Sequence, residues 1–285
     1  MSTPNTAFVR QYQDNIQILV QQLDNRLRQA VMVDMNFKGD SKFYEQYASD
    51  SMVELTSRYA DTPVQLPDHR RRKVTPRFYV SNTLEDPKDA LQMLVDPKST
   101  YMQAKQGAVN RQVDDTIITA FNATAYTGQD GTTSQAFDSN YQIAVGTTGL
   151  TKAKMLSAKK LLDAAENEKE DRFIVVSAEQ VEDLLNTTEV TSADYNTTRA
   201  LVEGTINTWI GFKFIHSERL NTSSGNRLVY AWQKKAMQLA IQKDAMGRID
   251  ERADKNYAWQ VYMKICLGAT RLEENRIVEI ACSES

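Results

Sequence analysis

Few side chains in this sequence have the types and the spacing that enzymatic chemistry or metal binding requires. The only histidines are His69 and His216, and the only cysteines are Cys266 and Cys282. A structural zinc site usually takes four Cys or His ligands, and the histidines lie far from each other and from the cysteines. A Ser/His/Asp arrangement would have to use His69, which we expect on a loop tip, or His216, which we expect at a strand end. We therefore predict no metal site, no catalytic triad and two buried free thiols.

Other motifs of catalytic and ligand-binding sites are missing from the sequence. It contains no GxxxxGK(S/T) phosphate loop, no GxGxxG after a strand, no HExxH and no GxSxG. Asp114 and Asp115 are adjacent, and neighbours on a helix point about 100° apart, so they cannot face each other as a catalytic pair. The acidic side chains between residues 166 and 171 lack the glycine and the ligand spacing of a calcium loop. The sequence predicts no catalytic residue and no cofactor.

One run of basic side chains could bind an anion. The run comprises Arg70, Arg71, Arg72 and Lys73. It begins at the end of the segment ADTPVQLPDHRR, which contains two prolines and which we expect to form the exposed tip of a loop. Four cations could meet phosphate, but no stacking aromatics alternate with them, and the chain has a formal net charge of −3. We favour ion pairs with carboxylates of a neighbouring protein; phosphate contact and simple solvent exposure are the alternatives.

The composition is that of a globular protein. The chain has 285 residues, of which 41% are hydrophobic and 25% charged, enough for one large or two modest domains. No stretch approaches the roughly eighteen consecutive apolar residues of a membrane span, and the N-terminus lacks the hydrophobic core of a signal peptide. We expect a protein that is made in a cytoplasm and has no membrane partner.

A long helix is the element that the sequence marks best. Residues 97–123 carry apolar side chains every three or four positions, and Pro97 suits the first helical turn. At about 1.5 Å per residue, this helix would be about 40 Å long. Its other side is polar and includes Lys105, Arg111 and Asp114. The pattern predicts one buried and one exposed side.

Residues 8–31 predict a second amphipathic helix. Apolar side chains recur at helical spacing through this stretch and include Tyr12, Ile16 and Leu23. The helix could lie on the core of its own chain, or it could be an arm that lies on a neighbouring subunit. No turn signal folds it back sharply, so both interpretations stay open.

Residues 42–85 predict a long protruding hairpin. Two extended stretches, 43–59 and 73–83, flank the basic tip. In the second stretch apolar and polar side chains alternate as in a strand, and Pro76 places that strand at a sheet edge. An isolated hairpin is marginally stable in water, so we expect something else to cover this one.

The rest of the sequence predicts an α/β lobe followed by late strands. We expect a turn-rich loop over 126–149, a helix over 151–168 capped by Thr151, a buried strand over 173–176, and a helix that opens with a capping box of Ser177 and Gln180. Two short strands on either side of Gly211 and further strands over 228–232, 259–267 and 277–282 follow. The predicted fold class is α+β.

The order of these parts resembles the major capsid protein of tailed bacteriophages, the Hong Kong 97-type fold. In the long helix, the family's spine pattern is similar to Ala108, Arg111, Asp114 or Asp115, Ile117 and Ile118. Its late motifs resemble the stretch 204–217, the turn Ser217-Glu218-Arg219-Leu220-Asn221, and Trp232-Gln-Lys-Lys-Ala236. The resemblance implies an N-terminal arm over 1–42, an extended two-stranded loop over 43–85, a peripheral domain with the spine helix over 86–123, an axial domain over 124–227, and late strands over 228–285 that return to both domains.

This resemblance implies a structural function and not an enzymatic one. Copies of the chain would self-assemble as pentamers and hexamers into the icosahedral shell of a virion around a double-stranded DNA genome, with or without separate scaffolding, portal and decoration proteins. The packaged DNA would be bound without sequence preference. The residues expected at subunit interfaces are Arg70, Arg71, Arg72, Lys73, Arg111, Asp114, Tyr12, Ile16 and Leu23. The alternatives are an encapsulin-like compartment that encloses cargo enzymes, or a small-molecule α/β enzyme.

Overall fold

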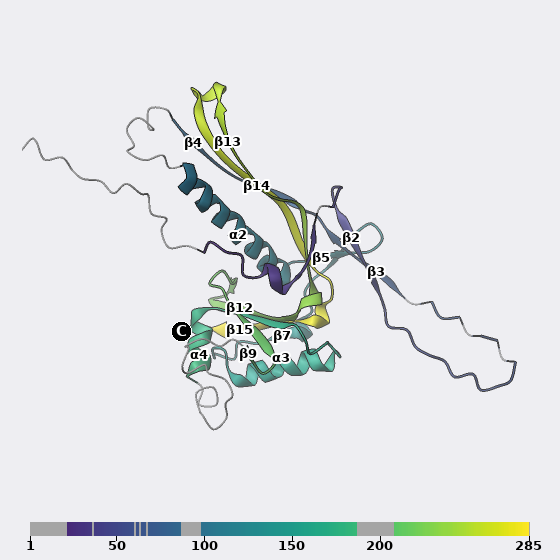
Figure 1. Cartoon of the computed structure of the whole chain (residues 1–285). Coiled ribbons are helices and arrows are strands. Elements are labelled where there is room, and N and C mark those ends of the chain that lie inside the picture. The colour runs from purple at the N-terminus through teal and green to yellow at the C-terminus, as the bar shows by residue number, and fades with distance from the viewer. Residues whose placement is uncertain are drawn as a thin grey trace, which may run out of the picture. The chain divides into compact units, whose positions relative to one another are not determined.

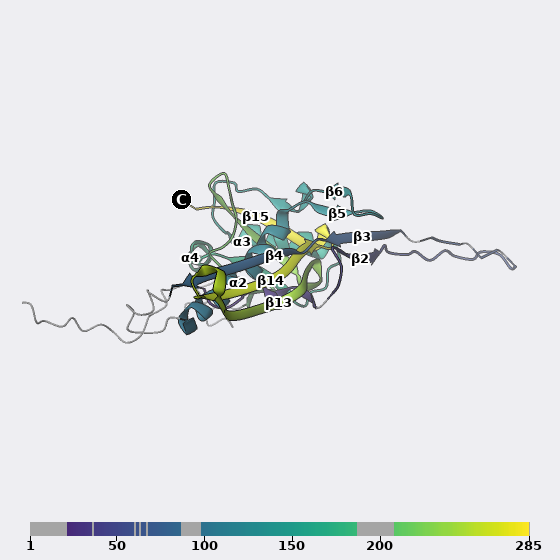
Figure 2. The same cartoon turned by 90° about the horizontal axis from the view of Figure 1, so that it is seen from above.

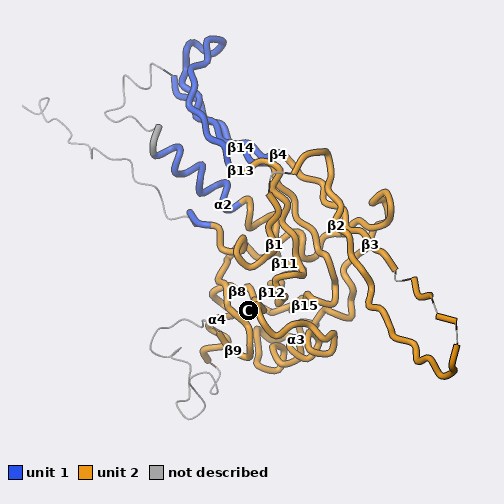
Figure 3. The backbone as a smooth tube through the Cα atoms, turned by 45° about the vertical axis from the view of Figure 1, so that its right-hand side comes forward, with its two compact units in different colours: residues 1–24, 78–111, 245–265 blue, residues 25–77, 112–244, 266–285 orange. Residues whose placement is uncertain are grey.

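The structure, a computed structural model, describes residues 22–35, 37–59, 61–62, 64–66, 68–86, 98–186 and 208–284. The chain divides into two compact units (Figure 3). The smaller unit comprises residues 1–24, 78–111 and 245–265, and the larger unit comprises residues 25–77, 112–244 and 266–285.

Helix α2 (Lys98–Asn122) confirms the predicted long helix to within one residue at each end. In the larger unit its apolar positions are buried at helical spacing, as in Ile117 and Phe121. The Phe121 ring stacks on Tyr230 with a centroid distance of 4.8 Å and lies 4.7 Å from the ring of Trp232. These aromatic contacts tie the last turns of α2 to a strand more than a hundred residues away in the chain.

The polar side predicted for this helix is wrong at two positions, because Lys105 and Asp114 are buried. Each has polar partners that make its burial tolerable. In the smaller unit the Lys105 ammonium donates to Ser81 Oγ at 3.0 Å. In the larger unit the Asp114 carboxylate accepts hydrogen bonds from backbone amides of the N-terminal segment.

The core of the larger unit is a seven-stranded sheet in the order β7-β15-β12-β8-β10-β9, with β11 paired to β12. Strand β8 runs parallel to β10 and antiparallel to β12, and β15 runs antiparallel to β12. The strands are β7 (Gln142–Ile143), β8 (Arg172–Val176), β9 (Thr208–Trp209), β10 (Phe212–His216), β11 (Thr222–Ser223), β12 (Asn226–Gln233) and β15 (Ile277–Ser283). The predicted strands over 173–176, 228–232 and 277–282 are confirmed.

Two helices accompany this sheet (Figure 1). Helix α3 (Lys152–Ala164) begins at the predicted cap Thr151 but ends four residues before the predicted end at 168, and Glu166 has a left-handed φ of 54° that interrupts helical geometry. Helix α4 (Ala178–Leu185) opens with the predicted capping box of Ser177 and Gln180. Both starts therefore follow from local side-chain hydrogen bonds.

A second sheet has the strand order β1-β13-β14-β4. Its strands are β1 (Met32–Met35), β4 (Arg77–Glu85), β13 (Met237–Arg252) and β14 (Ala258–Arg271), and Figure 2 shows the last three running side by side. The sequence analysis did not predict β13, although it is sixteen residues long. Within the smaller unit, a Cβ at Gly247 of β13 would lie 3.0 Å from Met102 Sδ of α2, so a larger residue there would require the Met102 side chain to shift.

A third sheet, β2-β3-β5-β6, corrects the predicted hairpin. Strand β2 (Lys42–Tyr47) pairs antiparallel with β3 (His69–Val74), and β3 pairs on its other side with β5 (Ala125–Thr127), which pairs with β6 (Thr133–Gln135). The predicted pairing of 43–59 with 73–83 is wrong, since Pro76 separates β3 from β4 and β4 belongs to the second sheet. Pro76 does precede an edge strand, as predicted.

The N-terminal segment also differs from its prediction. From residue 22 onward the predicted helix over 8–31 is wrong, because the chain forms only a 3-10 turn, η1 (Arg28–Ala30), before β1. Residues 8–21 lie outside the described residues. The Trp232 indole donates to Ala30 O at 2.8 Å, which fixes this turn on the sheet of the larger unit. The remaining 3-10 turns are η2 (Ser139–Tyr141), η4 (Lys234–Ala236), η5 (Ala253–Lys255) and η6 (Glu274–Arg276).

Candidate subunit-interaction surfaces

The basic run lies on a strand and not on a loop tip, so its predicted location is wrong. His69 to Val74 form β3, where successive side chains alternate between the two faces. Arg71 donates to Glu45 Oε1 on β2 at 2.8 Å, and Arg70 donates to Asp68 at 3.2 Å. All four of these side chains are largely exposed. Such exposed ion pairs contribute little to stability, so Arg70 and Arg71 can exchange partners at low cost.

Arg72 has a different environment from its two neighbours. It is only 4% exposed, and its guanidinium donates to both carboxylate oxygens of Glu274 at 2.9 and 3.1 Å. It also donates to Gln135 Oε1 and to Leu272 O, each at 2.9 Å. The five donors of an arginine are well used by this set of acceptors. Arg72 therefore anchors β3 within its own subunit and is not available to a neighbour.

A second buried arginine extends this cluster. Arg271 donates to Phe121 O at 3.1 Å and to Ala123 O, carbonyl groups at the C-terminal end of α2 that have no partner within the helix. Its guanidinium lies 5.2 Å from the Phe137 ring centroid and 3.8 Å from Glu274. Burial lowers the pKa of Arg271, and Glu274 opposes this effect. One carboxylate thus serves two buried guanidinium groups, which makes Glu274 the central residue of the cluster.

Lys73 is also engaged within its own subunit. Its ammonium lies 5.9 Å from the ring centroid of Phe43, and a Cβ at Gly131 would lie 2.5 Å from its Cδ. The left-handed φ of 62° at Gly131 lets the turn between β5 and β6 pass close over this side chain. Arg70 and Arg71 are thus the residues of the basic run that face solvent.

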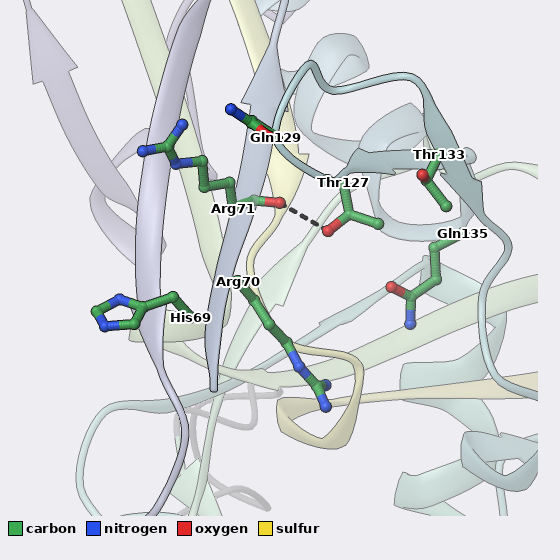
Figure 4. Close-up of a pocket in the computed structure, with 8 residues that line it drawn as sticks. His69, Arg70, Arg71, Thr127, Gln129, Thr133 and Gln135 are labelled. Carbon is green, nitrogen blue, oxygen red and sulfur yellow. Dashed lines mark hydrogen bonds between the residues drawn. The ribbon is translucent and has the colours of Figure 1, made fainter. Parts of the chain in front are cut away.

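A groove of about 570 Å³ lies between β3 and the β5–β6 hairpin. It is lined by His69, Arg70, Arg71, Thr127, Gly128, Gln129, Thr133 and Gln135, a set that contains no carboxylate. Figure 4 shows Arg70 extending from β3 to the side on which Gln135 lies, while His69 and Arg71 point to the other side. The Thr127 hydroxyl donates to Arg71 O at 2.8 Å. The groove therefore offers positive charge and hydrogen-bond donors in a polar setting.

The segment that joins β2 to β3 carries a set of exposed apolar side chains. Residues 49–66 contain no helix or strand in the part that the structure describes. The side chains with half or more of their surface exposed are Met52, Val53, Leu55, Tyr59, Val64 and Leu66. A soluble monomer rarely exposes so many large apolar groups in one place. The sequence analysis missed this feature, although the sequence shows these apolar residues before and between the two prolines of the segment.

Two of the predicted interface residues on α2 bind the N-terminal segment of their own chain. In the larger unit, Asp114 accepts from Arg26 N at 3.1 Å and from Leu27 N at 3.1 Å. In the smaller unit, Arg111 donates to Gln22 O at 2.8 Å. The predicted placement of Asp114 on an exposed face is wrong. The two backbone amides need a hydrogen-bond acceptor, and the buried Asp114 carboxylate is that acceptor.

The other predicted interface residues lie in the N-terminal segment. Leu23 is 44% exposed, and a Cβ at Gly107 of α2 would lie 2.9 Å from its Cδ2. Leu23 is thus in contact with the helix on one side and accessible on the other. Tyr12 and Ile16 lie outside the described residues.

The two histidines, both in the larger unit, have structural partners. His216 ends β10, where its Nδ1 lies 3.0 Å from Arg26 Nη1 and its Nε2 lies 3.0 Å from Glu218 Oε1. His69 is on β3 and packs edge-on against the ring of Tyr47, with centroids 4.3 Å apart. The expected strand-end position of His216 is confirmed, and the expected loop-tip position of His69 is wrong.

The cysteines are free and buried, as predicted. Cys266 donates to Gln242 Oε1 at 3.1 Å. Burial raises the pKa of Cys266, and it raises that of Cys282 to about 12. Within the described ranges, no three His, Cys, Asp or Glu side chains are placed to hold a metal ion. In the same part of the chain no helix is long and apolar enough to cross a membrane.

Comparison with known proteins identifies the family. A family model described as phage capsid protein matches residues 5–284. The capsid structure of the cyanophage P-SCSP1u is similar, with a TM-score of 0.78 and 15% sequence identity, over 99% of this chain and 94% of that one. The cyanophage Pam1 capsid has a TM-score of 0.76 and 12% identity, over 99% and 98%. The head structure of Helicobacter pylori bacteriophage KHP40 has a TM-score of 0.73 and 11% identity, over 98% and 96%.

No curated protein matches the sequence. The similarity to solved capsids confirms the predicted α+β class and the Hong Kong 97-type fold. A compartment for cargo enzymes and a small-molecule enzyme are not favoured by these matches. The chain belongs to the phage capsid protein family, and its function is that of a structural major capsid protein.

Proposed function

We propose that copies of this chain assemble as pentamers and hexamers into the closed icosahedral shell of a virion, around packaged double-stranded DNA. Synthesis in the host cytoplasm and the participation of scaffolding, portal or decoration proteins belong to the same proposal. Residues 1–42 act as an arm, 43–85 as the extended loop, 86–123 as the peripheral domain with its spine helix, and 124–227 as the axial domain. The late strands over 228–285 complete both domains.

The observation that carries this proposal is the exposed apolar segment between β2 and β3. Met52 and Tyr59 are fully exposed, and Leu66 is 90% exposed. Covering such side chains with a neighbouring copy removes apolar surface from water, at about 25 cal/mol for each Å². The segment is then stabilised only when copies meet, so its stability is linked to shell assembly.

Four of the predicted interface residues keep an accessible side chain or backbone that a neighbour can reach in this proposal: Arg70, Arg71, Arg111 and Leu23. Tyr12 and Ile16 are proposed for the arm. Arg72, Lys73 and Asp114 are withdrawn from the interface because their partners are within the same subunit. Reversing all four charges of the basic run would therefore damage the fold as well as the interface.

A shortened loop tests the proposal. The ribbon formed by β2 and β3 is closed by a hydrogen bond from Ala48 N to Asp68 O at 3.0 Å. Residues 49–67 can therefore be replaced by an Asn-Gly turn. We expect the full chain to form shells visible by negative-stain microscopy, with nuclease-protected nucleic acid in particles from infected cells. The shortened chain should keep the melting temperature of the unassembled subunit and form no shells. Normal shells from the shortened chain would refute the proposed role of the segment.

A further inference from the structure

We propose that the groove between β3 and the β5–β6 hairpin receives the acidic segment of a second copy, residues 50–61 between its β2 and β3. This inference rests on the proposed shell assembly and names the surface that one copy offers to the next. The groove supplies Arg70 and hydrogen-bond donors, and the incoming segment supplies carboxylates.

The groove selects for an acceptor-rich partner. None of its eight lining residues is acidic, whereas two are arginines and four carry hydroxyl or amide groups. In the part of the chain that the structure describes, the side chains of Gln129 and Thr133 make no hydrogen bond. Among the described residues, Asp68 is the one counterion of Arg70, in an exposed pair at 3.2 Å that an incoming carboxylate can replace. Thr127 already donates to Arg71 O and Gln135 to Glu274 Oε2, so Arg70, Gln129 and Thr133 are the donors left for a partner.

Strand β3 also leaves part of its outer edge open at the groove. Its residues pair with β5 only at Arg72 and Lys73, so no strand lies beside His69, Arg70 and Arg71 on that side, where the Thr127 hydroxyl occupies the Arg71 carbonyl. An extended segment can lie along this edge, as peptides do on open sheet edges. The groove thus fits an extended chain better than a compact ligand.

The segment between β2 and β3 has the matching charge. Asp50, Glu54 and Asp61 stand against one cation, Arg58, and no ion pair involves these three carboxylates among the described residues. The adjacent side chains of Met52, Val53 and Leu55 are exposed. Carboxylates that alternate with apolar groups suit a polar groove that is flanked by a neighbour's surface.

The segment of the same copy is poorly placed to fill its own groove. It leaves the ribbon at Tyr47 and returns at His69, and Figure 1 shows it continuing beyond the ends of β2 and β3, away from β5. A second copy meets no such constraint. Since the groove and the segment are different surfaces, the contact is head-to-tail, and repetition of a head-to-tail contact closes a ring when the rotation permits. A ring of copies is what pentamers and hexamers require.

A charge-swap series tests this contact. The groove variant carries Arg70→Glu, the segment variant carries Asp50→Lys, Glu54→Lys and Asp61→Lys, and a third chain carries all four changes. Lys160→Glu on α3 changes the net charge as much as the groove variant does and serves as the matched control. Circular dichroism and thermal melting of unassembled subunits show that each chain is folded, and shell yield is measured by sedimentation and negative-stain microscopy.

We expect each reversal alone to lower the shell yield at least about tenfold at low salt, since like charges then face each other. The chain with all four changes should recover most of the yield, and the α3 control should assemble normally. The inference is overturned if the groove variant assembles as well as the wild type, if the combined chain does not recover, or if the α3 control loses as much. A groove variant that assembles normally but retains less nucleic acid would assign the groove to phosphate instead. If the unaltered chain forms no shells, the proposed function fails independently of the groove.

Discussion

The seven-stranded sheet and the segment between β2 and β3 differ in the exposure of their apolar side chains. In the sheet, Ile174, Val229 and Ile280 are fully buried within a single subunit. In the segment, Met52 and Leu66 are almost entirely in water. The sheet is therefore stable within a single subunit, whereas the segment is stabilised only by contact with a second protein. One chain thus combines a part that folds alone with a part that is completed by assembly.

The cluster around Glu274 fixes the ribbon of β2 and β3, from which the segment extends, to β14 and the end of α2. It binds Arg72 at the base of the ribbon and lies near Arg271, which binds the end of α2. Because the cluster is buried, the base of the ribbon is held firmly even though its far end is exposed. The four changes below separate what the sheet, the cluster and the segment each contribute.

The largest effect is expected at the junction. Among the described residues, Glu274 is the carboxylate that pairs with both buried guanidinium groups, so we expect Glu274→Gln to lower the free energy of unfolding by about 3 to 5 kcal/mol. Chemical denaturation of unassembled subunits measures this loss. Glu273→Gln is the matched control, because Glu273 pairs with Arg276 at 2.8 Å in a more exposed position and its loss should cost less than about 1 kcal/mol. Equal losses of stability in the two variants would show that the cluster around Glu274 does not hold the ribbon of β2 and β3 in place.

The next change compares the two regions directly. Ile174→Ala leaves a cavity in the sheet and should cost about 3 kcal/mol in the unassembled subunit. Leu66→Ala removes a similar apolar group from the segment and should change the same quantity by less than about 0.5 kcal/mol. Denaturation of assembled shells should narrow this difference, because Leu66 is then covered. A comparable loss from Leu66→Ala in the free subunit would mean that the segment already packs within its own copy.

A smaller effect is expected from the cap of α4. Ser177→Ala removes half of the capping box with Gln180 and should lower the free energy of unfolding by about 1 kcal/mol. Ser177→Asn keeps a capping oxygen and should recover part of the loss. Thermal melting of both variants distinguishes a cap effect from a general response to substitution, which would be the same for alanine and asparagine.

The smallest effect concerns acid. Arg227 donates to both carboxylate oxygens of Glu284, at 2.7 and 3.0 Å, and this hydrogen bonding lowers the pKa of Glu284 below its usual value of 4.5. The stabilisation is complete above the unfolded pKa and is lost as the pH falls through the lower folded pKa. Glu284→Gln should therefore reduce stability by less than about 1 kcal/mol at neutral pH and flatten its decline below pH 4.5.

The matching control for this measurement is Glu54→Gln in the exposed segment, where the described residues form no ion pair with the carboxylate. It removes the same charge as Glu284→Gln without removing a hydrogen bond to an arginine, so it measures the effect of net charge alone. An equal flattening by both substitutions would mean that net charge, and not the pair with Arg227, governs the response to acid.

The sequence predicted best those elements that are coded by neighbouring residues. The 3.6-residue pattern of 97–123 specified α2, and the order of a short apolar run, Ser177 and Gln180 specified β8 and α4. These features depend on contacts within one or two turns. The order of such elements was sufficient for the resemblance to a capsid fold.

Features that depend on distant residues were missed or misplaced. Arg72 was expected on an exposed loop tip, paired with a neighbouring protein, because its partner Glu274 is 202 positions away in the sequence. Strand β13 escaped prediction because its outer half, KDAMGRIDER, is rich in charge and contains Gly247, and only pairing with other strands makes it extended. Asp114 was placed on the exposed side of α2 because the amides of Arg26 and Leu27 that it binds are far away in sequence.

Because both cysteines are buried, the subunit should react slowly with thiol reagents. Cys266 and Cys282 are shielded, and burial keeps their thiols protonated at neutral pH. A cysteine introduced at Met52 would therefore be the one thiol in the chain that a maleimide reaches quickly. Its labelling rate would then report, during assembly and without any other label, when each subunit's segment is covered by a neighbour.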